Sequence, residues 1–118
     1  MLVNKEFNVV DRPWGKFLQF TSNENTTIKL LELKKGKSIS YQYHNFRSET
    51  WYCITGWCWA TKDIDQGVLS HALKPGEVFT IPIKSRHMLE GLEDSIILEI
   101  SRGQFDENDI VRLPSPKL

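Results

Sequence analysis

Two segments of this sequence carry side chains that could bind a metal ion together. The first segment contains Gln42, His44 and Glu49. Gln42 and His44 are two residues apart, so on an extended strand both side chains point to the same side. Glu49 follows after a short connection, on the strand expected to return past them. This hairpin would present an amide oxygen, an imidazole nitrogen and a carboxylate, a mixed set that suits a divalent ion such as zinc, manganese, iron, cobalt or nickel.

The second segment supplies a further imidazole. A turn at Gly76 precedes a short apolar strand, and His87 comes eleven residues after that glycine. Together with the first segment this gives four ligands and leaves open coordination positions for water and substrate. Open positions are typical of a catalytic site, whereas structural metal sites are closed. We therefore predict a divalent-metal site formed by Gln42, His44, Glu49 and His87.

Short strands joined by turns must position these residues. The chain consists of short apolar or alternating stretches separated by Gly, Pro, Asn and Asp residues, which is typical of an antiparallel β sandwich or barrel. It has no glycine-rich phosphate loop and no long amphipathic helix, which excludes nucleotide-binding α/β folds. A single helical turn is predicted near residues 106–110, and an extended tail at residues 114–116. The predicted strands are residues 16–21, 27–33, 38–44, 49–55, 57–62, 68–73, 78–81, 86–89 and 96–101.

The composition sets further limits. The chain has 118 residues, 40% of them hydrophobic, so we expect one globular domain over residues 1–118. Its 15 Lys+Arg balance 15 Asp+Glu, which argues against nucleic-acid and anionic-membrane partners. No apolar run approaches the ~20 residues that cross a bilayer, and charges stand where a signal peptide would be apolar. Cys53 and Cys58 match no metal or redox motif, so we predict two free thiols and a cytoplasmic location.

The two metal-ligand segments resemble the two sequence motifs of the cupin family. The first motif, G-x5-H-x-H-x4-E-x6-G, fits residues 36–56 with Gln42 at the first histidine position. The second, G-x5-P-x-G-x2-H-x3-N, fits residues 76–91 with Lys84 at the usual glycine position and Gly91 at the usual asparagine position. Within the cupins the chain is most similar to the type II phosphomannose isomerases. The matching pieces are Arg12-Pro13-Trp14-Gly15, Ser40-Tyr41-Gln42-Tyr43-His44, Arg47-Ser48-Glu49-x-Trp51, Ile81-Pro82, His87-x-Leu89-Glu90 and Asp109-Ile110-Val111-Arg112.

This resemblance implies an all-β cupin fold, a double-stranded β-helix or jelly-roll barrel, and a metal-dependent sugar-phosphate isomerase. In proteins of this type a metal ion held by Gln, His, Glu and His assists the interconversion of mannose 6-phosphate and fructose 6-phosphate. A base moves a proton between C2 and C1 while a Lewis acid stabilises the enediolate oxygens. We expect zinc in the first place, with manganese, cobalt, nickel or iron as alternatives, and a role in nucleotide-sugar supply.

Three charged residues are candidates for contacts with the sugar phosphate. Arg47 has the same strand parity as Glu49 and could grip the phosphate bidentately; the alternative is a salt-bridged surface arginine. Lys84, in the loop before His87, is a second phosphate candidate at the expected barrel mouth. The candidate catalytic bases are Glu99, on the last predicted strand, and a metal-bound hydroxide; the alternative for Glu99 is a surface carboxylate at a strand edge.

The chain departs from the family pattern at positions that could carry the proton. The family stretch commonly has two further histidines where this chain has Phe46 and Thr50, and a basic residue where it has Met88. Two other functions therefore stay open. One is a non-catalytic or regulatory sugar-binding cupin that retains the metal pocket. The other is a metal cupin that acts on another sugar or a small acid.

The remaining notable residues have structural interpretations. His71 has no ligand-type neighbour two residues away and is predicted at the surface. Trp57 and Trp59 alternate with small residues, so we expect the small residues inside and the tryptophans against a second sheet or a subunit. Resemblance to cupins that pair through such faces implies a homodimer. Trp14 is expected to fix the first strand by packing, and Asp109 to hold the C-terminal segment to the barrel as a cap.

Overall fold

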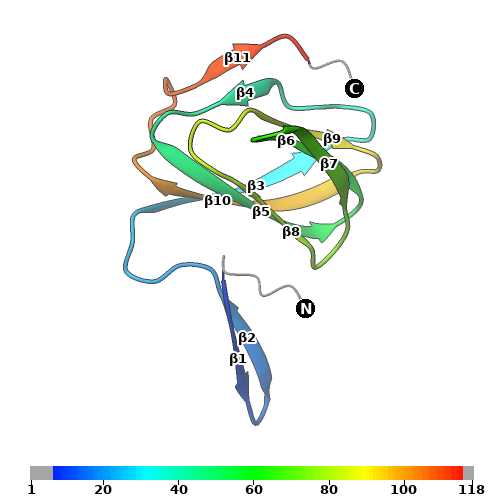
Figure 1. The fold of residues 1–118 in the computed structure, drawn as a ribbon. Coiled ribbons are helices and arrows are strands. Elements are labelled where there is room, and N and C mark those ends of the chain that lie inside the picture. The colour runs from blue at the N-terminus through cyan, green and yellow to red at the C-terminus, as the bar shows by residue number, and fades with distance from the viewer. Residues whose placement is uncertain (1–6, 116–118) are drawn as a thin grey trace.

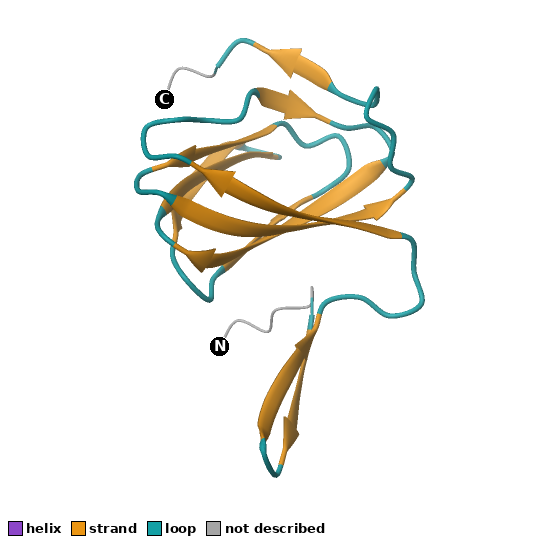
Figure 2. Ribbon diagram, turned by 180° about the vertical axis from the view of Figure 1, so that it is seen from behind, coloured by secondary structure: helices purple, strands orange, loops and turns teal. Residues whose placement is uncertain are grey.

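Two antiparallel sheets face each other and form a barrel in the computed structural model, which describes residues 7–115 (Figure 1). One sheet has the strand order β3-β10-β5-β8 and the other β11-β4-β9-β6-β7, while β1 and β2 form a hairpin that projects from the barrel. The described residues contain no helix (Figure 2). The strands are β1 (Asn8–Arg12), β2 (Gly15–Gln19), β3 (Thr26–Leu33), β4 (Tyr41–Tyr43), β5 (Arg47–Thr55), β6 (Cys58–Ile64), β7 (Gly67–Leu73), β8 (Val78–Ile81), β9 (His87–Gly91), β10 (Ser95–Gly103) and β11 (Val111–Leu113).

The pairing of β5 with β10 determines which polar side chains enter the barrel. Glu49 lies opposite Ser101, and Trp51 lies opposite Glu99. Residues that oppose each other in an antiparallel pair point to the same face of the sheet, and alternate residues along each strand share that face. All four side chains are buried. The two strands therefore direct a tryptophan, a serine and two carboxyl groups into one interior.

A hydrophobic core fills part of this interior and holds the two sheets together. Trp51 on β5 stacks on Phe79, its partner on the neighbouring strand β8, with ring centroids 5.8 Å apart and planes 13° apart, and this pair packs in one cluster with Cys58, Ala60, Leu73 and Leu89 of the other sheet. Each fully buried large apolar side chain contributes about 1.5–3 kcal/mol relative to exposure. The core cluster consists of Trp51, Cys53, Cys58, Ala60, Leu73, Phe79, Ile81, Leu89 and Ile97.

The nine predicted strands are all present, as β2 to β10, and two strands were not predicted. β4 is shorter than predicted, because Ser38 forms only an isolated bridge with Glu90. The unpredicted strands are β1 and β11. The prediction of a helical turn near residues 106–110 is wrong: the Asp109 N–H donates to the Asp106 carbonyl at 2.9 Å in a tight turn that does not continue. Of the predicted extended tail, Pro116 lies outside the described residues.

The tryptophan predictions have opposite outcomes. Trp14 lies at the tip of the β1–β2 hairpin and is 73% exposed, so the prediction that it packs is wrong. Cys58 and Ala60 are fully buried while Trp57 and Trp59 are 39% and 36% exposed, which confirms the predicted alternation. The tryptophans thus lie on the outer face of the sheet that contains β6.

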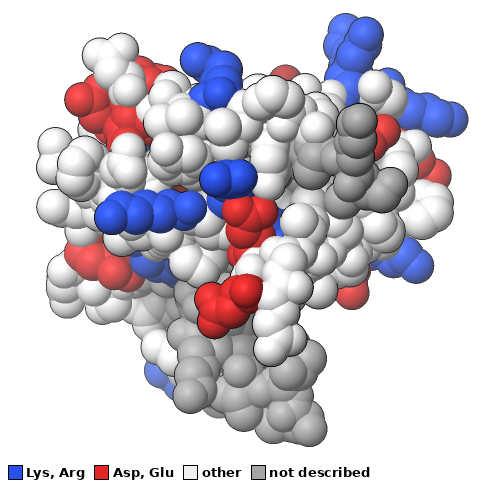
Figure 3. Space-filling view, turned by 45° about the horizontal axis from the view of Figure 1, so that its top comes forward, with Lys and Arg blue, Asp and Glu red and all other residues white. Residues whose placement is uncertain are grey.

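The outer surface carries charges of both signs. Basic and acidic side chains are interspersed on the face shown in Figure 3, in keeping with the balanced formal charge of the sequence. Both cysteines are buried free thiols, as predicted. Among the described residues, no helix is long and apolar enough to cross a membrane.

Candidate metal centre

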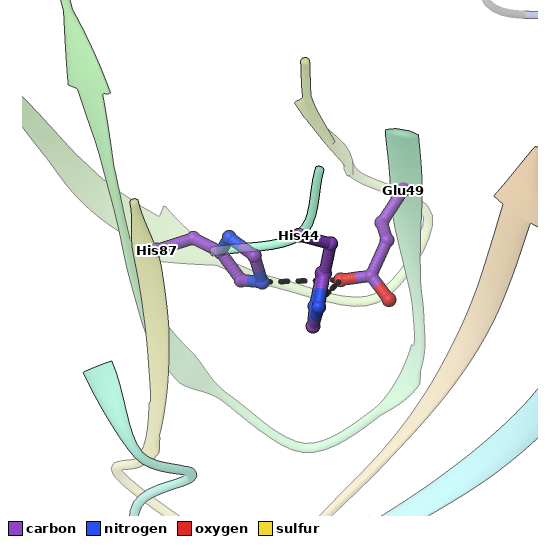
Figure 4. Close-up of side chains that lie close together, drawn as sticks. All are labelled: His44, Glu49 and His87. Carbon is purple, nitrogen blue, oxygen red and sulfur yellow. Dashed lines mark ion pairs between the residues drawn. The ribbon is translucent and has the colours of Figure 1, made fainter. Parts of the chain in front are cut away.

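Three buried side chains from three segments converge inside the barrel (Figure 4). Glu49 lies on β5, His87 begins β9, and His44 lies in the connection between β4 and β5. His87 Nε2 is 3.1 Å from Glu49 Oε1, and His44 Nε2 is 3.6 Å from the same oxygen. One nitrogen or oxygen atom from each residue lies within 4.8 Å of the others, and none of the three residues is more than 3% exposed. This spacing allows the three residues to coordinate one ion.

Two main-chain carbonyls orient the histidine rings. His44 Nδ1 donates to the carbonyl of Asp109 at 2.8 Å, and His87 Nδ1 donates to the carbonyl of Ser85 at 2.8 Å. A carbonyl only accepts, so both rings carry a proton on Nδ1 and direct Nε2 toward Glu49. Histidines that bind metal ions are commonly held by a hydrogen bond from the other ring nitrogen in this way.

The converging atoms have the chemistry that a divalent ion requires. Glu49 Oε1 and His87 Nε2 are buried without a hydrogen-bond partner in the described part of the chain, and so is the nearby Arg47 Nε. An unsatisfied buried polar atom costs about 1–3 kcal/mol. Two lone-pair atoms 3.1 Å apart also repel each other unless they share a cation or a proton. One carboxylate and two imidazoles therefore fit a transition-metal ion of the zinc, manganese or iron type.

The Glu49 carboxyl is held in its ionised form. Burial raises its pKa, but the interaction with the imidazoles of His44 and His87 outweighs burial and lowers the pKa well below its ordinary value. The second oxygen of the carboxylate, Oε2, accepts a hydrogen bond from Ser101 Oγ at 3.2 Å. Glu49 thus has one oxygen fixed by β10 and the other directed at the histidines.

Gln42, the fourth predicted ligand, lies beside this cluster. It is the residue of β4 that pairs directly with His87 of β9, so its side chain shares the interior face. Its Oε1 accepts a hydrogen bond from Ser40 Oγ at 2.7 Å. The structure brings the three ionisable candidates together, and coordination of a metal ion by them and by Gln42 stays a prediction.

Glu99 is inside the barrel and only 8% exposed. The alternative of a surface carboxylate at a strand edge is therefore wrong. Trp51 Nε1 donates to Glu99 Oε1 at 3.2 Å. Burial, followed by the negative charge of Glu49, raises the pKa of Glu99 to about 7. A buried carboxyl that can exchange a proton near neutral pH has the property of a general acid or base.

Arg47 is 6% exposed, so the alternative of a surface arginine is also wrong. Its Nη1 donates to the carbonyls of Asp106 at 3.1 Å and Asp109 at 3.5 Å. Its Nη2 donates to His44 Nε2 at 3.4 Å, and its guanidinium lies 4.3 Å from the centre of the Phe105 ring. The guanidinium thus borders the metal-ligand cluster under the segment that follows β10.

Lys84 is exposed and its backbone is in the left-handed region, with φ of 68°. This conformation is natural for glycine and costs another residue roughly 1–2 kcal/mol, which explains the motif's preference for glycine here. The Lys84 N–H donates to the carbonyl of His44 at 2.8 Å. Its backbone therefore supports the site, and a role for its ammonium group stays a prediction.

The side chains at the three positions where the chain departs from the family pattern lie away from the metal-ligand cluster. Thr50 follows Glu49 on β5 and therefore faces the opposite side, where its hydroxyl accepts a hydrogen bond from Arg102 Nη1 at 2.6 Å. Met88 follows His87 on β9 in the same way. Phe46 is 61% exposed. Their side chains leave the interior carboxyl and imidazole groups unchanged.

Two predictions outside the motifs are confirmed. His71 is exposed, contacts the Phe79 ring at 5.0 Å and takes no part in the cluster. Asp109 is a cap: its carboxylate accepts the N–H groups of Asn45 at 2.9 Å and Phe46 at 3.0 Å. The contact between the Asp109 carbonyl and His44 was not predicted, because a main-chain carbonyl leaves no signal in side-chain types.

A pocket of about 210 Å³ lies along β5 and β8. Its lining consists of Ser48, Glu49, Thr80, Ile81 and Pro82, so Glu49 is the one member of the cluster that it includes. The carboxylate of Glu49 lies near a second carboxyl, Glu99, whose pKa is raised to about 7, and its Oε2 is 3.6 Å from Arg47 Nε. Such a set can bind a divalent ion and an anion and can transfer a proton.

Comparison of the sequence with known families gives one match over nearly the whole chain. The sequence model of the family described as mannose-6-phosphate isomerase C-terminal matches residues 3–115. The mannose-1-phosphate guanylyltransferase RfbM of Salmonella typhimurium is 31% identical over 112 residues, which are 92% of this chain and 22% of that protein. The alginate biosynthesis protein AlgA of Pseudomonas putida is 31% identical over 106 residues, which are 87% of this chain and 21% of that protein. The chain thus spans about one fifth of the length of these relatives.

Comparison of the structure with solved structures identifies the same barrel in oxalate decarboxylase from Bacillus subtilis. The structure of that enzyme at pH 4.6 has a TM-score of 0.68 and 24% identity, and the match covers 76% of this chain and 24% of that chain. A second structure, which concerns the Mn(II) centres of the enzyme, has a TM-score of 0.66 and 26% identity over 77% of this chain and 25% of that chain. These matches establish the fold.

Proposed function

Because this chain belongs to the mannose-6-phosphate isomerase C-terminal family and has the cupin fold, we propose that it is a metal-dependent isomerase of mannose 6-phosphate and fructose 6-phosphate. The observation that carries the proposal is the convergence of His44 Nε2, Glu49 Oε1 and His87 Nε2 in a buried site. The relatives named for mannose-1-phosphate and alginate chemistry support carbohydrate and nucleotide-sugar biosynthesis as its setting.

The proposed metal ligands are Gln42, His44, Glu49 and His87. When bound, a divalent ion would supply Lewis-acid stabilisation of the negative charge that develops on the substrate oxygens. The two imidazoles and the carboxylate would hold it, and the Gln42 amide would complete the set after giving up its hydrogen bond with Ser40. We propose zinc as the first candidate, with manganese, cobalt, nickel and iron as alternatives.

Glu99 is the proposed proton carrier. It would accept the proton from C2 of the aldose and return it to C1, while the proton of the C2 hydroxyl passes to the C1 oxygen, so that the substrate is isomerised and no oxidant is consumed. Trp51 Nε1 fixes one carboxyl oxygen, and the pKa of about 7 allows Glu99 to act in both directions near neutral pH. This assignment needs no histidine at position 46 or 50.

Arg47 and Lys84 are the proposed phosphate contacts. The guanidinium of Arg47 lies beside His44 Nε2, where it places a fixed positive charge at the edge of the cluster. The ammonium group of Lys84 is exposed in the loop that precedes His87.

The free, buried thiols of Cys53 and Cys58 support a reducing compartment, and we propose the cytoplasm as the place of action.

One observation favours a second function, a non-catalytic sugar-binding cupin. The guanidinium of Arg47 already donates to the carbonyls of Asp106 and Asp109 and is 6% exposed. A phosphate could reach it only if the segment after β10 moved. If that segment stays in place, the site would bind a metal ion and a neutral or small ligand without isomerising a sugar phosphate.

The test is a coupled assay of mannose 6-phosphate conversion on protein loaded in turn with zinc, manganese, cobalt or nickel. We expect turnover with at least one ion.

Elemental analysis should show near-stoichiometric metal that is lost in His44→Ala and His87→Ala but kept in His71→Ala, the matched control. Glu99→Gln should keep the metal and lower kcat by roughly 10²–10⁴-fold. Lys84→Gly should raise KM with little change in kcat, since glycine suits its backbone conformation.

The outcomes separate the two functions. Folded, metal-loaded protein that shows no turnover with any of the four ions would contradict the isomerase proposal. Calorimetric binding of a sugar without turnover would then support the binding function. If His44→Ala and His87→Ala retain their metal, the assignment of the metal centre is wrong.

A further inference from the structure

The segment between β10 and β11, residues 104–110, crosses the side of the metal-ligand cluster that holds Arg47 and His44. We call it the strap. We propose that Asp109 of the strap is a positioning residue that fixes the ring of His44 for metal binding, an inference that rests on the proposed metal centre. The strap would then belong to the machinery of the site as well as to the attachment of the C-terminal segment.

Asp109 contacts the ligand-bearing segment through two different groups. Its carboxylate accepts the Asn45 N–H at 2.9 Å and the Phe46 N–H at 3.0 Å. Its main-chain carbonyl accepts His44 Nδ1–H at 2.8 Å. The same strap residue therefore holds the backbone just after His44 and the ring of His44 itself.

These contacts close a small ring of hydrogen bonds around one metal ligand. Because the carboxylate is tied to the backbone one and two residues after His44, the carbonyl of the same residue has a fixed place relative to the His44 side chain. The carbonyl selects the Nδ1–H tautomer and restrains rotation of the ring, so Nε2 points toward Glu49 Oε1 at 3.6 Å. Without the contacts of the Asp109 carboxylate, the Asp109 carbonyl would no longer be held opposite Nδ1 of His44.

Further contacts anchor the rest of the strap. Arg47 Nη1 donates to the carbonyls of Asp106 and Asp109, and the Phe105 ring lies between two cations, 4.3 Å from the Arg47 guanidinium carbon and 4.7 Å from Lys29 Nζ. Hydrogen bonds to a charged partner are stronger than those between neutral groups. The strap is therefore held at Phe105, Asp106 and Asp109, and these contacts restrict the movement of Asp109.

A cap that only stabilises the fold and a residue that positions His44 make different predictions. A cap contributes to the free energy of unfolding and leaves metal affinity unchanged in protein that remains folded. A positioning residue changes the tautomer of the His44 ring and the dissociation constant of the metal. Partners that orient metal-binding histidines typically contribute about 10–100-fold to metal affinity when they are removed.

The experiment compares Asp109→Ala and Asp109→Asn with Glu107→Ala, a matched control in the same strap. Glu107 is exposed and pairs with Lys29 at 3.4 Å, so its substitution removes one strap carboxylate without touching His44. Zinc affinity is measured by competition with a chelator. The tautomer of His44 is read by nitrogen-15 NMR of the metal-free protein, with the two other histidines as internal references.

We expect wild type and Glu107→Ala to show the Nδ1–H tautomer and the same zinc affinity within about twofold. Asp109→Ala should lose the single tautomer and bind zinc about 10–100-fold more weakly. Asp109→Asn, which retains one acceptor oxygen, should lie between them and provides the test if the alanine variant fails to fold.

Folded Asp109 variants with the wild-type tautomer and wild-type zinc affinity would overturn the inference. Failure of the proposed function is distinguishable from this result. If wild-type protein binds no zinc but the tautomer of His44 changes in the Asp109 variants, the positioning role holds and the metal centre is wrong. A variant that loses zinc with an unchanged tautomer would also contradict positioning by the carbonyl.

Discussion

Two buried carboxyl groups on one face of the barrel have pKa values displaced in opposite directions. Glu49 is stabilised as a carboxylate by the imidazoles of His44 and His87, whereas burial and the charge of Glu49 raise the pKa of Glu99. Pairs of titratable groups whose environments separate their pKa values commonly divide the roles of charge stabilisation and proton transfer. The residue types alone could not show this, because Glu99 differs from a surface glutamate only in its register with Trp51 on β5.

The raised pKa of Glu99 predicts a specific pH dependence of stability. A carboxyl whose pKa rises from 4.5 to about 7 on folding binds its proton more tightly in the folded protein. Stability therefore falls as pH rises from about 4.5 to about 7. Each pKa unit corresponds to about 1.4 kcal/mol, so the loss is on the order of 3 kcal/mol. Glu99→Gln, which imitates the protonated carboxyl, should be stabilised relative to wild type at pH 8 and nearly equal to it at pH 5.

Urea denaturation of the metal-free protein in EDTA between pH 5 and pH 8 measures this effect. Glu107→Gln removes the same charge from a side chain that is 77% exposed, and it should follow the wild-type curve. Parallel curves for Glu99→Gln and wild type would contradict the assignment of Glu99 as a buried carboxyl with a raised pKa.

At the scale of the strands, the sequence pattern predicts which of the candidate site residues face the barrel interior. Gln42, His44, Glu49 and His87 could be chosen from their spacing in the sequence and from the family resemblance. Of these, the three ionisable residues converge as predicted.

The missed elements have physical causes. β1 pairs only with β2 in a projecting hairpin, so neither of its faces needs an apolar stripe. β11 has three residues, too few to show alternation. The predicted helical turn is replaced by a tight turn because the Asp106 carboxylate accepts the Asn108 N–H at 2.9 Å, a local contact that competes with helix.

Two tryptophans in different elements should respond differently to substitution. Trp14 at the hairpin tip is 73% exposed, and Trp51 on β5 is fully buried. Trp14→Ser should change the free energy of unfolding by less than about 0.5 kcal/mol. Trp51→Ala should cost about 3–5 kcal/mol, because it leaves a cavity beside Phe79 and removes the donor to Glu99.

Urea denaturation followed by circular dichroism compares the two tryptophan variants with wild type. A cost above about 2 kcal/mol for Trp14→Ser would show that the hairpin tip packs against other protein in solution. Such a result would contradict the exposed position of Trp14 at the hairpin tip.

At the scale of the whole molecule, charge is distributed differently on the surface and in the interior of the barrel. Acidic and basic side chains are interspersed among uncharged residues on the face seen in Figure 3 and give no extended region of one sign. The interior instead concentrates charge, with Arg47, Glu49 and Glu99 all less than a tenth exposed. A formally neutral chain can therefore hold a strongly polarised interior.

The homodimer implied by the family resemblance stays a prediction, and the structure indicates a surface for it. Trp57 and Trp59 lie on the outer face of the sheet that contains β6, where they are 39% and 36% exposed. A two-fold dimer would bury the same surface on both copies. A standard interface takes about 800 Å² from each partner, roughly a tenth of the 7753 Å² surface of the chain. Partly exposed tryptophans are well suited to the centre of such an interface.

Light scattering of the purified protein should then give twice the mass of one chain at micromolar concentration. Trp59→Glu would place a charge at the centre of the apolar contact on both copies at once, and it should shift the protein to monomer while the barrel stays folded. Ile28→Glu is the matched control, because Ile28 is 61% exposed on β3 of the opposite sheet. Dissociation by the control instead would assign the interface to the opposite sheet and overturn the role of the tryptophans. A wild-type protein that stays monomeric across the concentration range would contradict the dimer itself.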